Sequence, residues 1–380
     1  MSASPSTAGE AQGYFDELVT AATESLTGAE VLLANVAGER TDFIRFNNGD
    51  VRQAGTIDQR VLSIDLIEGQ RHVAGSISLS GERSSDDARI RTLLARLREQ
   101  RAHVLDDPFL LYNTDTVSTD RVETGAIPAP DAALADIRTA AAGRDLVGIY
   151  ASGDTYSGFA NSLGQRNWFQ SATFNLDWCF YLRADKAAKN LYAGFEWDDD
   201  AFAAKIDWSA RQLAALERDP VDLPPGEYRT FLAPRAVEEI TQLLSWYGAF
   251  GRRAHETRQT PLLKMLVDDV TLSPLVNISE DTGGGVAPNF QSSGFVRPDR
   301  VPLVTNGVYT DTLVSPRSAQ EFGIATNGAG DDEEPESLAI SPGDVPTDAV
   351  NEALGTGLYV GNLWYLNFSD QAACRTTGMT

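Results

Sequence analysis

The first hundred residues alternate between helical and strand-like spacing of their apolar positions. A first amphipathic helix is predicted from an apolar face formed by Tyr14, Phe15, Leu18, Val19 and Ala22. Apolar and polar residues then alternate between residues 30 and 79, with turn sequences at 47–50 and 68–70, which predicts an antiparallel meander with one buried face. A second helix follows, with an inner face of Ile90, Leu93, Leu94 and Leu97. This order predicts an α+β unit over residues 11–105, after a disordered segment at residues 1–10 that is rich in Ser, Ala, Gly and Pro.

The middle of the chain predicts a second α+β segment, at residues 106–218. A linker that contains three prolines, residues 106–130, leads to a predicted helix at 131–142 and a strand at 146–151. Residues 168–182 and 190–197 are rich in aromatic and β-branched side chains, which are typical of strands, and residues 202–216 return to helical spacing. The proline-rich stretch at 220–226 is the predicted boundary with the C-terminal part.

Beyond this boundary, the pattern predicts mostly antiparallel β-structure with long loops. A short strand at 228–232 precedes a helix in which Pro234 occupies the first turn and which ends near Gly248. After Asp268 the chain is rich in turn residues. The whole sequence therefore predicts an α+β protein, in which an N-terminal region of helices and antiparallel meander is followed by a mostly antiparallel β domain at residues 219–380.

The net charge of the chain argues against two classes of partner, nucleic acids and anionic membranes. The chain has 54 Asp and Glu against 31 Lys and Arg, which gives a formal net charge of -23. Nucleic acids and anionic membranes need a basic protein face, so neither is expected as a partner of this acidic protein. The sequence has no apolar run of the ~20 residues that a membrane helix needs and no secretory signal pattern. The two cysteines, Cys179 and Cys374, form no disulfide framework, so we expect a cytoplasmic protein.

Candidate catalytic chemistry is sparse. The only histidines are His72, His103 and His255. The pair His255-Glu256 begins like a zinc-peptidase helix, but Gln and Thr occupy positions 259 and 260, and Pro261 would break the helix. The sequence also lacks the G-x-S-x-G elbow of a serine hydrolase. The residues themselves therefore predict no metal ligands and no catalytic set.

Five segments, in the same order, resemble the TldD/PmbA metallopeptidase family. They are residues 45–55, 159–164 with an Asn-Ser-x-Gly turn, 228–250 with Ala-Pro-Arg-Ala-Val, 261–308, and 357–380. In that family the TldD-type subunit carries an H-E-x-x-x-H zinc motif on the helix of the third segment, whereas the TldE/PmbA-type subunit lacks the motif and pairs with a TldD-type partner. Residues 242–251 of this chain contain no histidine. The chain therefore resembles the TldE/PmbA type.

The resemblance implies a non-catalytic subunit of a heterodimeric zinc metallopeptidase that processes or degrades unstructured peptides such as leader peptides. It implies no catalytic residue, no metal ligand and no cofactor in this chain, with zinc held by the TldD-type partner. It also implies further strands after Thr380, where family members continue. A peptide-binding surface is predicted from ten residues: Asp281, Gly283, Gly284, Gly285, Asn289, Gln291, Ser292, Ser293, Trp364 and Tyr365. For Trp364 and Tyr365, ordinary packing within a strand is the alternative.

Two other functions are compatible with the sequence. The chain could be a stand-alone peptide-binding or scaffold protein without protease activity. It could also be a metal-independent hydrolase whose catalytic residues follow no recognisable motif. A neighbouring gene for an H-E-x-x-x-H subunit would favour the heterodimer over the scaffold. Activity of the isolated chain in the presence of a chelator would favour the hydrolase.

Overall fold

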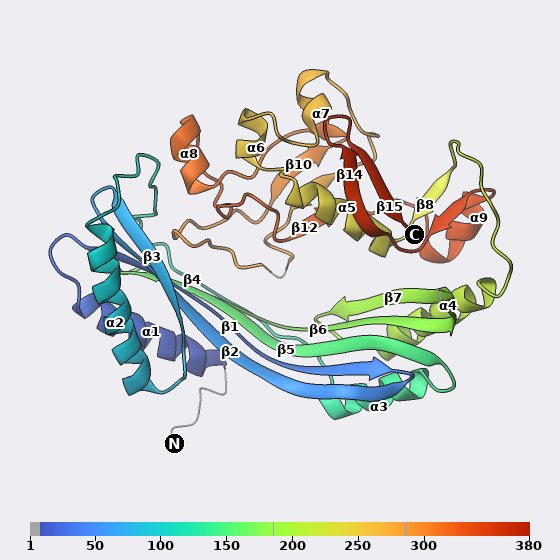
Figure 1. The fold of residues 1–380 in the computed structure, drawn as a ribbon, viewed down its shortest axis with the longest axis horizontal. Coiled ribbons are helices and arrows are strands. Elements are labelled where there is room, and N and C mark those ends of the chain that lie inside the picture. The colour runs from blue at the N-terminus through green and yellow to red at the C-terminus, as the bar shows by residue number, and fades with distance from the viewer. Residues whose placement is uncertain (1–7, 185, 286) are drawn as a thin grey trace.

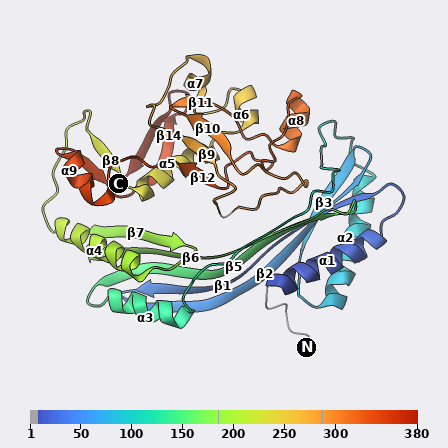
Figure 2. The same ribbon diagram turned by 180° about the vertical axis from the view of Figure 1, so that it is seen from behind.

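A computed structural model describes residues 8–184, 186–285 and 287–380 of the chain. Its largest feature is a long, curved seven-stranded sheet, with helices α1 and α3 on one side and the C-terminal domain on the other (Figure 1; Figure 2 shows the reverse side). The strand order is β3-β2-β1-β5-β6-β4, and β7 also pairs with β6. All neighbours are antiparallel except β4 and β6. The strands are β1 (Val31–Asn47), β2 (Asp50–Glu68), β3 (Arg71–Ser78), β4 (Thr119–Glu123), β5 (Asp145–Asn161), β6 (Arg166–Arg183) and β7 (Lys186–Gly194).

The N-terminal helix and the meander are confirmed. Helix α1 (Ala8–Glu24) begins inside the segment that was expected to be disordered, and residues 1–7 of that segment lie outside the described residues. The β1–β2 turn falls at Asn48 and Gly49, whose φ angles of 52° and 74° are those that an Asn-Gly hairpin turn requires. Helix α2 (Arg83–Arg101) follows β3, and the Glu82 carboxylate caps it by accepting hydrogen bonds from the Ser84 and Ser85 amides.

The strands are much longer than the apolar alternation predicts. Residues 37–41 break the apolar pattern, yet they lie in the middle of β1 because β2 and β5 pair with this strand on both sides. Gly38 fits there because Tyr156 fills the space beside it: a Cβ on Gly38 would lie 2.3 Å from the Tyr156 ring. Pairing on two sides therefore holds a polar stretch in extended form that periodicity alone does not predict.

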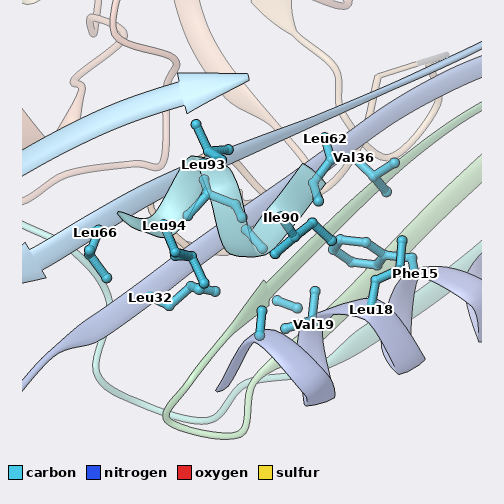
Figure 3. Close-up of a cluster of buried hydrophobic side chains, with 14 of the residues drawn as sticks. Phe15, Leu18, Val19, Leu32, Val36, Leu62, Leu66, Ile90, Leu93 and Leu94 are labelled. Atoms are coloured by element: carbon cyan, nitrogen blue, oxygen red, sulfur yellow. The ribbon is translucent and has the colours of Figure 1, made fainter. Parts of the chain in front are cut away.

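Two cores cover the same face of the sheet. The even-numbered residues of β1 contribute to both, because side chains alternate between the faces of a strand. The first core packs α1 and α2 onto β1 and β2; Figure 3 shows Phe15, Leu18 and Ile90 meeting Leu32 and Val36 there. The second core packs α3 (Pro130–Ala140) and α4 (Asp199–Ala215) around the aromatic side chains of β6. Strands from both predicted N-terminal units thus build one sheet, and the boundary at residue 105 separates sequence segments but not sheets.

The C-terminal domain is built from short strands and long loops, as expected. Antiparallel pairs make a four-stranded sheet in the order β11-β10-β9-β12, β14 pairs with β15, and only β8 and β13 are parallel. The α+β fold class is therefore confirmed. The strands are β8 (Thr230–Leu232), β9 (Ile278–Glu280), β10 (Val301–Thr305), β11 (Val308–Tyr309), β12 (Leu338–Ile340), β13 (Leu358–Val360), β14 (Trp364–Asp370) and β15 (Arg375–Met379). The helices are α5 (Pro234–Trp246), α6 (Arg252–Glu256), α7 (Leu263–Val267), α8 (Pro316–Phe322), η1 (Thr347–Ala349) and α9 (Val350–Leu354).

One edge of the large sheet is free over about half of β2. Strand β3 pairs only with residues 61–68 of β2, so residues 50–59 have β1 as their one strand neighbour in the described part of the chain. These ten residues are all exposed, including Val51 at 39% and Ile57 at 38%. Among the helices described, none is long and apolar enough to cross a membrane.

Candidate functional site

One face of the large sheet is covered by α1, α2, α3 and α4, and the opposite face is called the helix-free face. A small apolar core attaches the C-terminal domain near one end of the helix-free face. Phe290, from a loop of the C-terminal domain, is 3% exposed and packs with Leu33, Ile67, Phe159 and Phe169 from β1, β2, β5 and β6. Leu33 is an odd-numbered β1 residue, so this core lies on the face opposite the helices. A Phe buried between the sheet and the domain fixes the domain against that face.

A polar network surrounds this first attachment, and Gln165 is its centre. The Gln165 side chain is fully buried, and its Nε2 donates to the carbonyl of Gly294 at 2.7 Å and to Asn167 Oδ1 at 2.8 Å. Its Oε1 accepts from Asn113 Nδ2, which also donates to the Gly294 carbonyl. The network joins the 102–118 linker, the β5–β6 turn and the C-terminal domain. Because buried polar groups are costly when unpaired, this arrangement strongly favours one docking geometry.

Eight of the ten predicted peptide-binding residues take part in contacts within the chain at this attachment. Arg121 on β4 donates to the carbonyls of Thr282, Gly283 and Gly285. Three more of these residues form hydrogen bonds with the N-terminal half: Asn289 with Thr119, Ser292 with Asn35, and Ser293 with Asn113. The remaining three have contacts within the C-terminal domain. Asp281 forms a hydrogen bond with Ser337, Gly284 lies beside the Asp281 carboxylate, and Gln291, which is 4% exposed, forms hydrogen bonds with Phe295 and Gly294. The backbone groups that were expected to pair with a peptide are thus already used in part by the protein itself.

Trp364 and Tyr365, the other two predicted residues, lie at a second attachment. The Lys189 Nζ of β7 lies 4.4 Å from the centre of the Trp364 ring, and Arg235 of α5 approaches Asp177 of β6 at 3.8 Å. Trp364 is 43% exposed and Tyr365 is 81% exposed, so ordinary strand packing does not account for them. Tyr365 also has a φ of 50°, which is unusual for an aromatic residue and turns its backbone away from regular strand geometry.

The helix-free face remains accessible between the two attachments. Glu39 and Thr155 lie opposite each other in register, as do Arg45 and Ile149, and Asn175 lies one strand further along. Arg45, Thr155 and Asn175 are exposed, and Ile149 is 40% exposed. Both views place the C-terminal domain on this side of the sheet (Figures 1 and 2). The face thus offers mixed polar and apolar side chains near the exposed aromatic residues of β14.

His255 and Cys374 are the His and Cys side chains of the C-terminal domain. Within the described ranges, no three His, Cys, Asp or Glu side chains are grouped so that they could hold a metal ion. His255 lies on α6 against the Tyr309 ring, with 4.5 Å between ring centres. Burial lowers the pKa of His255 to about 4, so the imidazole is neutral at pH 7. The proximity of Cys374 to Arg375 does not activate the thiol, because burial raises the pKa of Cys374.

The attachment residues were not predicted from the sequence, although one pattern pointed near them. The Asn-Ser-x-Gly turn places Asn161 so that its Oδ1 accepts hydrogen bonds from the Leu163 and Gln165 amides, both at 3.0 Å. Ser162 Oγ accepts from the Leu32 amide. The turn therefore positions Gln165 at the attachment. No pattern in the sequence pointed to Arg121 or Asn113.

Comparisons with known proteins agree with this architecture. Residues 225–379 match the PmbA/TldA metallopeptidase C-terminal domain. No curated protein gives a significant sequence match. Solved structures share the fold, and three of them match over most of this chain. A candidate modulator of DNA gyrase from Thermotoga maritima is 14% identical with a TM-score of 0.70, and the match covers 92% of this chain and 82% of that one. TldE from Thermococcus kodakarensis is 13% identical with a TM-score of 0.66 and the same coverage.

The third structure, a candidate modulator of DNA gyrase from Bacteroides thetaiotaomicron, is 15% identical with a TM-score of 0.69, and the match covers 98% of this chain and 89% of that chain. At these identities the structural matches show the fold alone, whereas the match over residues 225–379 identifies the C-terminal domain. The C-terminal domain of this chain is therefore similar to that of the PmbA/TldA metallopeptidases, and nearly the whole chain shares its fold with these three structures.

Proposed function

We propose that this chain is a non-catalytic, TldE/PmbA-type subunit that acts with a zinc-bearing TldD-type partner on unstructured peptides in the cytoplasm. The observation that carries the proposal is the sequence of α5 and the residues after it. In the family resemblance this helix corresponds to the H-E-x-x-x-H helix, but residues 242–251 read Gln-Leu-Leu-Ser-Trp-Tyr-Gly-Ala-Phe-Gly. These side chains supply neither the imidazole ligands nor the general base that zinc hydrolysis needs.

The helix-free face of the sheet is the proposed peptide-binding surface, together with Trp364 and Tyr365. The polar and apolar side chains exposed on this face can contact an extended peptide with little demand on its sequence, which suits a protein that handles unstructured segments. The exposed Tyr365 and the half-exposed Trp364 offer aromatic contact area beside that face. The loop at residues 281–293 then contributes by holding the C-terminal domain over the face.

In this proposal the two subunits divide the work. Zinc in the partner would polarise the scissile carbonyl and activate water, as zinc does in peptidases. This chain would hold the peptide and complete the enclosure of the site. Its own residues would make no bond to the metal.

Co-expression with the H-E-x-x-x-H homologue from the same genome tests the proposal. We expect one joint peak in size exclusion, zinc that is retained only when the partner is present, and cleavage of an unstructured peptide only with both chains. The matched control is the same pair with the motif glutamate of the partner changed to Gln, which should still associate but not cleave. Stoichiometric zinc and cleavage with this chain alone would refute the proposal. Failure to associate would favour the stand-alone scaffold.

A substitution at the proposed peptide surface separates binding from assembly. Tyr365→Ala should weaken peptide affinity of the pair about threefold to tenfold, because a large aromatic contact is lost. Assembly and thermal stability should not change, since the side chain is 81% exposed. Leu275→Ala is the control, because Leu275 is 86% exposed and lies outside this surface. Equal affinity of the Tyr365→Ala pair and the control pair would exclude this part of the surface.

A further inference from the structure

A surface pocket of about 520 Å³ at the C-terminal end of α5 has no role in the proposed function so far. Three separate segments line it: the end of α5, residues 254–263, and the turn between β14 and β15. Contacts between these segments fix the walls relative to one another. The Tyr247 hydroxyl donates to Asn367 Oδ1 at 3.2 Å, and Gln371 Nε2 donates to the Gln259 carbonyl at 2.8 Å. The Tyr247 and Phe368 rings also meet edge to face, with 5.0 Å between their centres.

One wall of the pocket is aromatic. Trp246 is 75% exposed, which is unusual for the largest apolar side chain, and Tyr247 continues the same wall. Leu263 adds an aliphatic surface. Exposed aromatic side chains at a concave site are typical of places where a ligand covers them.

The segment at residues 252–264, which lines part of the pocket, is cationic, although the chain as a whole is strongly acidic. Residues 252–264 contain four Arg and Lys but only one carboxylate, whereas the whole chain has a net charge of -23. That carboxylate, Glu256, pairs with Arg252. Arg258 lines the pocket, and Lys264 follows the lining residue Leu263. Both are exposed, and neither forms an ion pair with another described residue.

Lys264 follows the lining residue Leu263 in the chain. Burial raises the pKa of the Cys374 thiol beside the β14–β15 turn, and the positive charge of Lys264 lowers it in part. Asp370 is a carboxylate at this turn, and it accepts a hydrogen bond from the Ala373 amide. Arg258 and Lys264 thus have no ion-pair partner among the described residues, although the Asp370 carboxylate lies at the β14–β15 turn.

We propose that this pocket binds an acidic segment of the peptide, with an aromatic or aliphatic side chain on Trp246 and Tyr247 and flanking carboxylates at Arg258 and Lys264. The inference rests on the proposed peptide-binding function and adds a substrate class to it. The chain as a whole is acidic and repels an acidic peptide, and at this pocket exposed cations lie beside exposed aromatic side chains. Exposed ion pairs contribute little each, so the aromatic contact supplies affinity and the cations supply selectivity.

Fluorescence polarisation with the full chain tests the proposal. The probe is a short, labelled, unstructured peptide in which Phe and Leu are flanked by Asp and Glu, and its comparison peptide has Asn and Gln in place of every acid. We expect the acidic peptide to bind about fivefold more tightly than the neutral one, and raising NaCl from about 50 mM to about 500 mM to remove that preference. Trp246→Ala should weaken both peptides about tenfold without lowering the melting temperature, because this side chain is largely exposed.

Two charge-matched double variants provide the decisive comparison. Arg258→Gln with Lys264→Gln should abolish the preference for the acidic peptide. Arg91→Gln with Arg96→Gln, which removes the same charge from exposed positions on α2, should preserve it. Equal binding of both peptides, or equal losses in both double variants, would overturn the pocket assignment while leaving peptide binding itself intact. If neither peptide binds the isolated chain, the assignment is also wrong, and the paired-subunit experiment still decides the proposed function.

Discussion

At the scale of single residues, the attachment of the C-terminal domain depends on polar groups that have no access to water. Gln165 is the clearest case, because its amide group reaches Val117, Asn167 and Gly294 while it accepts from Asn113. Asn167 Nδ2 also donates to the Val117 carbonyl and Asn113 Nδ2 to the Gly294 carbonyl, so these groups form one connected network. One side chain therefore satisfies groups from three parts of the chain.

Gln165→Leu should destabilise the protein by about 1–3 kcal/mol, because Asn167 Oδ1 loses its donor and the Val117 and Gly294 carbonyls each lose one of two donors. The shift of the urea unfolding midpoint measures this effect. Asn175→Leu on the same sheet face is the control, since Asn175 is exposed and its replacement should change stability by less than about 0.5 kcal/mol. Similar midpoints for the two variants would show that the Gln165 hydrogen bonds add no stability beyond that of an exposed amide.

Gly285→Ala tests whether the loop at residues 281–285 has a structural role. A Cβ at Gly285 would lie 1.4 Å from Ser337 Oγ, whose hydroxyl donates to the Asp281 carbonyl. The loop must move to accept the methyl group, so we expect a loss of about 1–3 kcal/mol in thermal unfolding. Adding Ser337→Gly to the same chain should restore part of the loss. A fully stable single variant would mean that the loop adapts freely and could still rearrange around a peptide.

At the scale of secondary-structure elements, one carboxylate joins the start of β1 to the end of α2. The Glu30 side chain is 1% exposed and accepts hydrogen bonds from Arg98 and Arg101 of α2 at 2.8 to 3.2 Å. Burial opposes its charged form, but the hydrogen bonds from Arg98, the Thr27 amide and Arg101 outweigh burial. They lower the pKa of Glu30 to about 2.

This pKa predicts a pH-dependent contribution of Glu30 to stability. A carboxyl whose pKa is lower in the folded state than the unperturbed value of 4.5 stabilises the fold above pH 4.5 and loses that contribution as the pH falls toward 2. Glu30→Gln should therefore cost about 2–3 kcal/mol at pH 7 and progressively less below pH 4.5. Urea titrations of both proteins at several pH values measure the difference. A difference that stays constant with pH would assign the effect to packing and not to charge.

The helices of the N-terminal half were predictable because each carries its signal locally. Apolar spacing located α1, α2, α3 and α4, and in the structure Asp198 caps α4 by accepting from the Ala201 amide at 2.7 Å. The lengths of β1 and β5 were not predictable, since their polar middles are held by pairing partners up to about 120 positions away in the register of β1 and β5. Local patterns thus predicted which elements form, whereas pairing between distant segments determines how long the strands are.

At the scale of the whole molecule, the C-terminal domain is held at both attachments and connected to α4 by the stretch at residues 216–229. The first attachment buries Phe290, and Arg317 of α8 reinforces it through an ion pair with Asp107 at 2.6 Å. The second attachment is a cation–π contact and an ion pair that are each partly exposed. Since exposed pairs contribute little, the apolar attachment dominates the docking of the domain.

Phe290→Ala should loosen this docking by about 3–4 kcal/mol, because a buried aromatic side chain is removed from a closed core. Limited trypsin digestion measures it, since Arg218 and Arg229 flank the connecting stretch and are exposed. We expect faster cleavage there in Phe290→Ala than in the control Trp364→Ala, which loses only the weaker second attachment. Equal cleavage rates would show that the two attachments hold the domain equally well.

The candidate site could be predicted from the sequence only in part, because the fold brings together segments that lie far apart in the chain. The sequence pointed to a glycine loop and to two aromatic residues, and the structure uses the loop mainly for contacts within the chain and leaves the aromatic residues exposed. The pocket beside Trp246 joins segments that are more than a hundred residues apart, and no local motif marks such a meeting. The positive charge near the pocket was not predicted either, because a net charge of -23 for the whole chain does not reveal a local group of cations.

The free edge of β2 has a consequence for how copies of the protein meet in solution. Ten consecutive residues that pair with β1 on one side and leave the other edge free, without proline or lysine, are a surface on which a strand of another molecule can be added. At low ionic strength the large negative charge keeps two copies apart, but dissolved salt shortens the range of that repulsion to about 8 Å near 0.15 M. Colloidal stability should therefore decline as salt is added, and a lysine placed at Ile57 would be the simplest way to prolong the shelf life of concentrated samples.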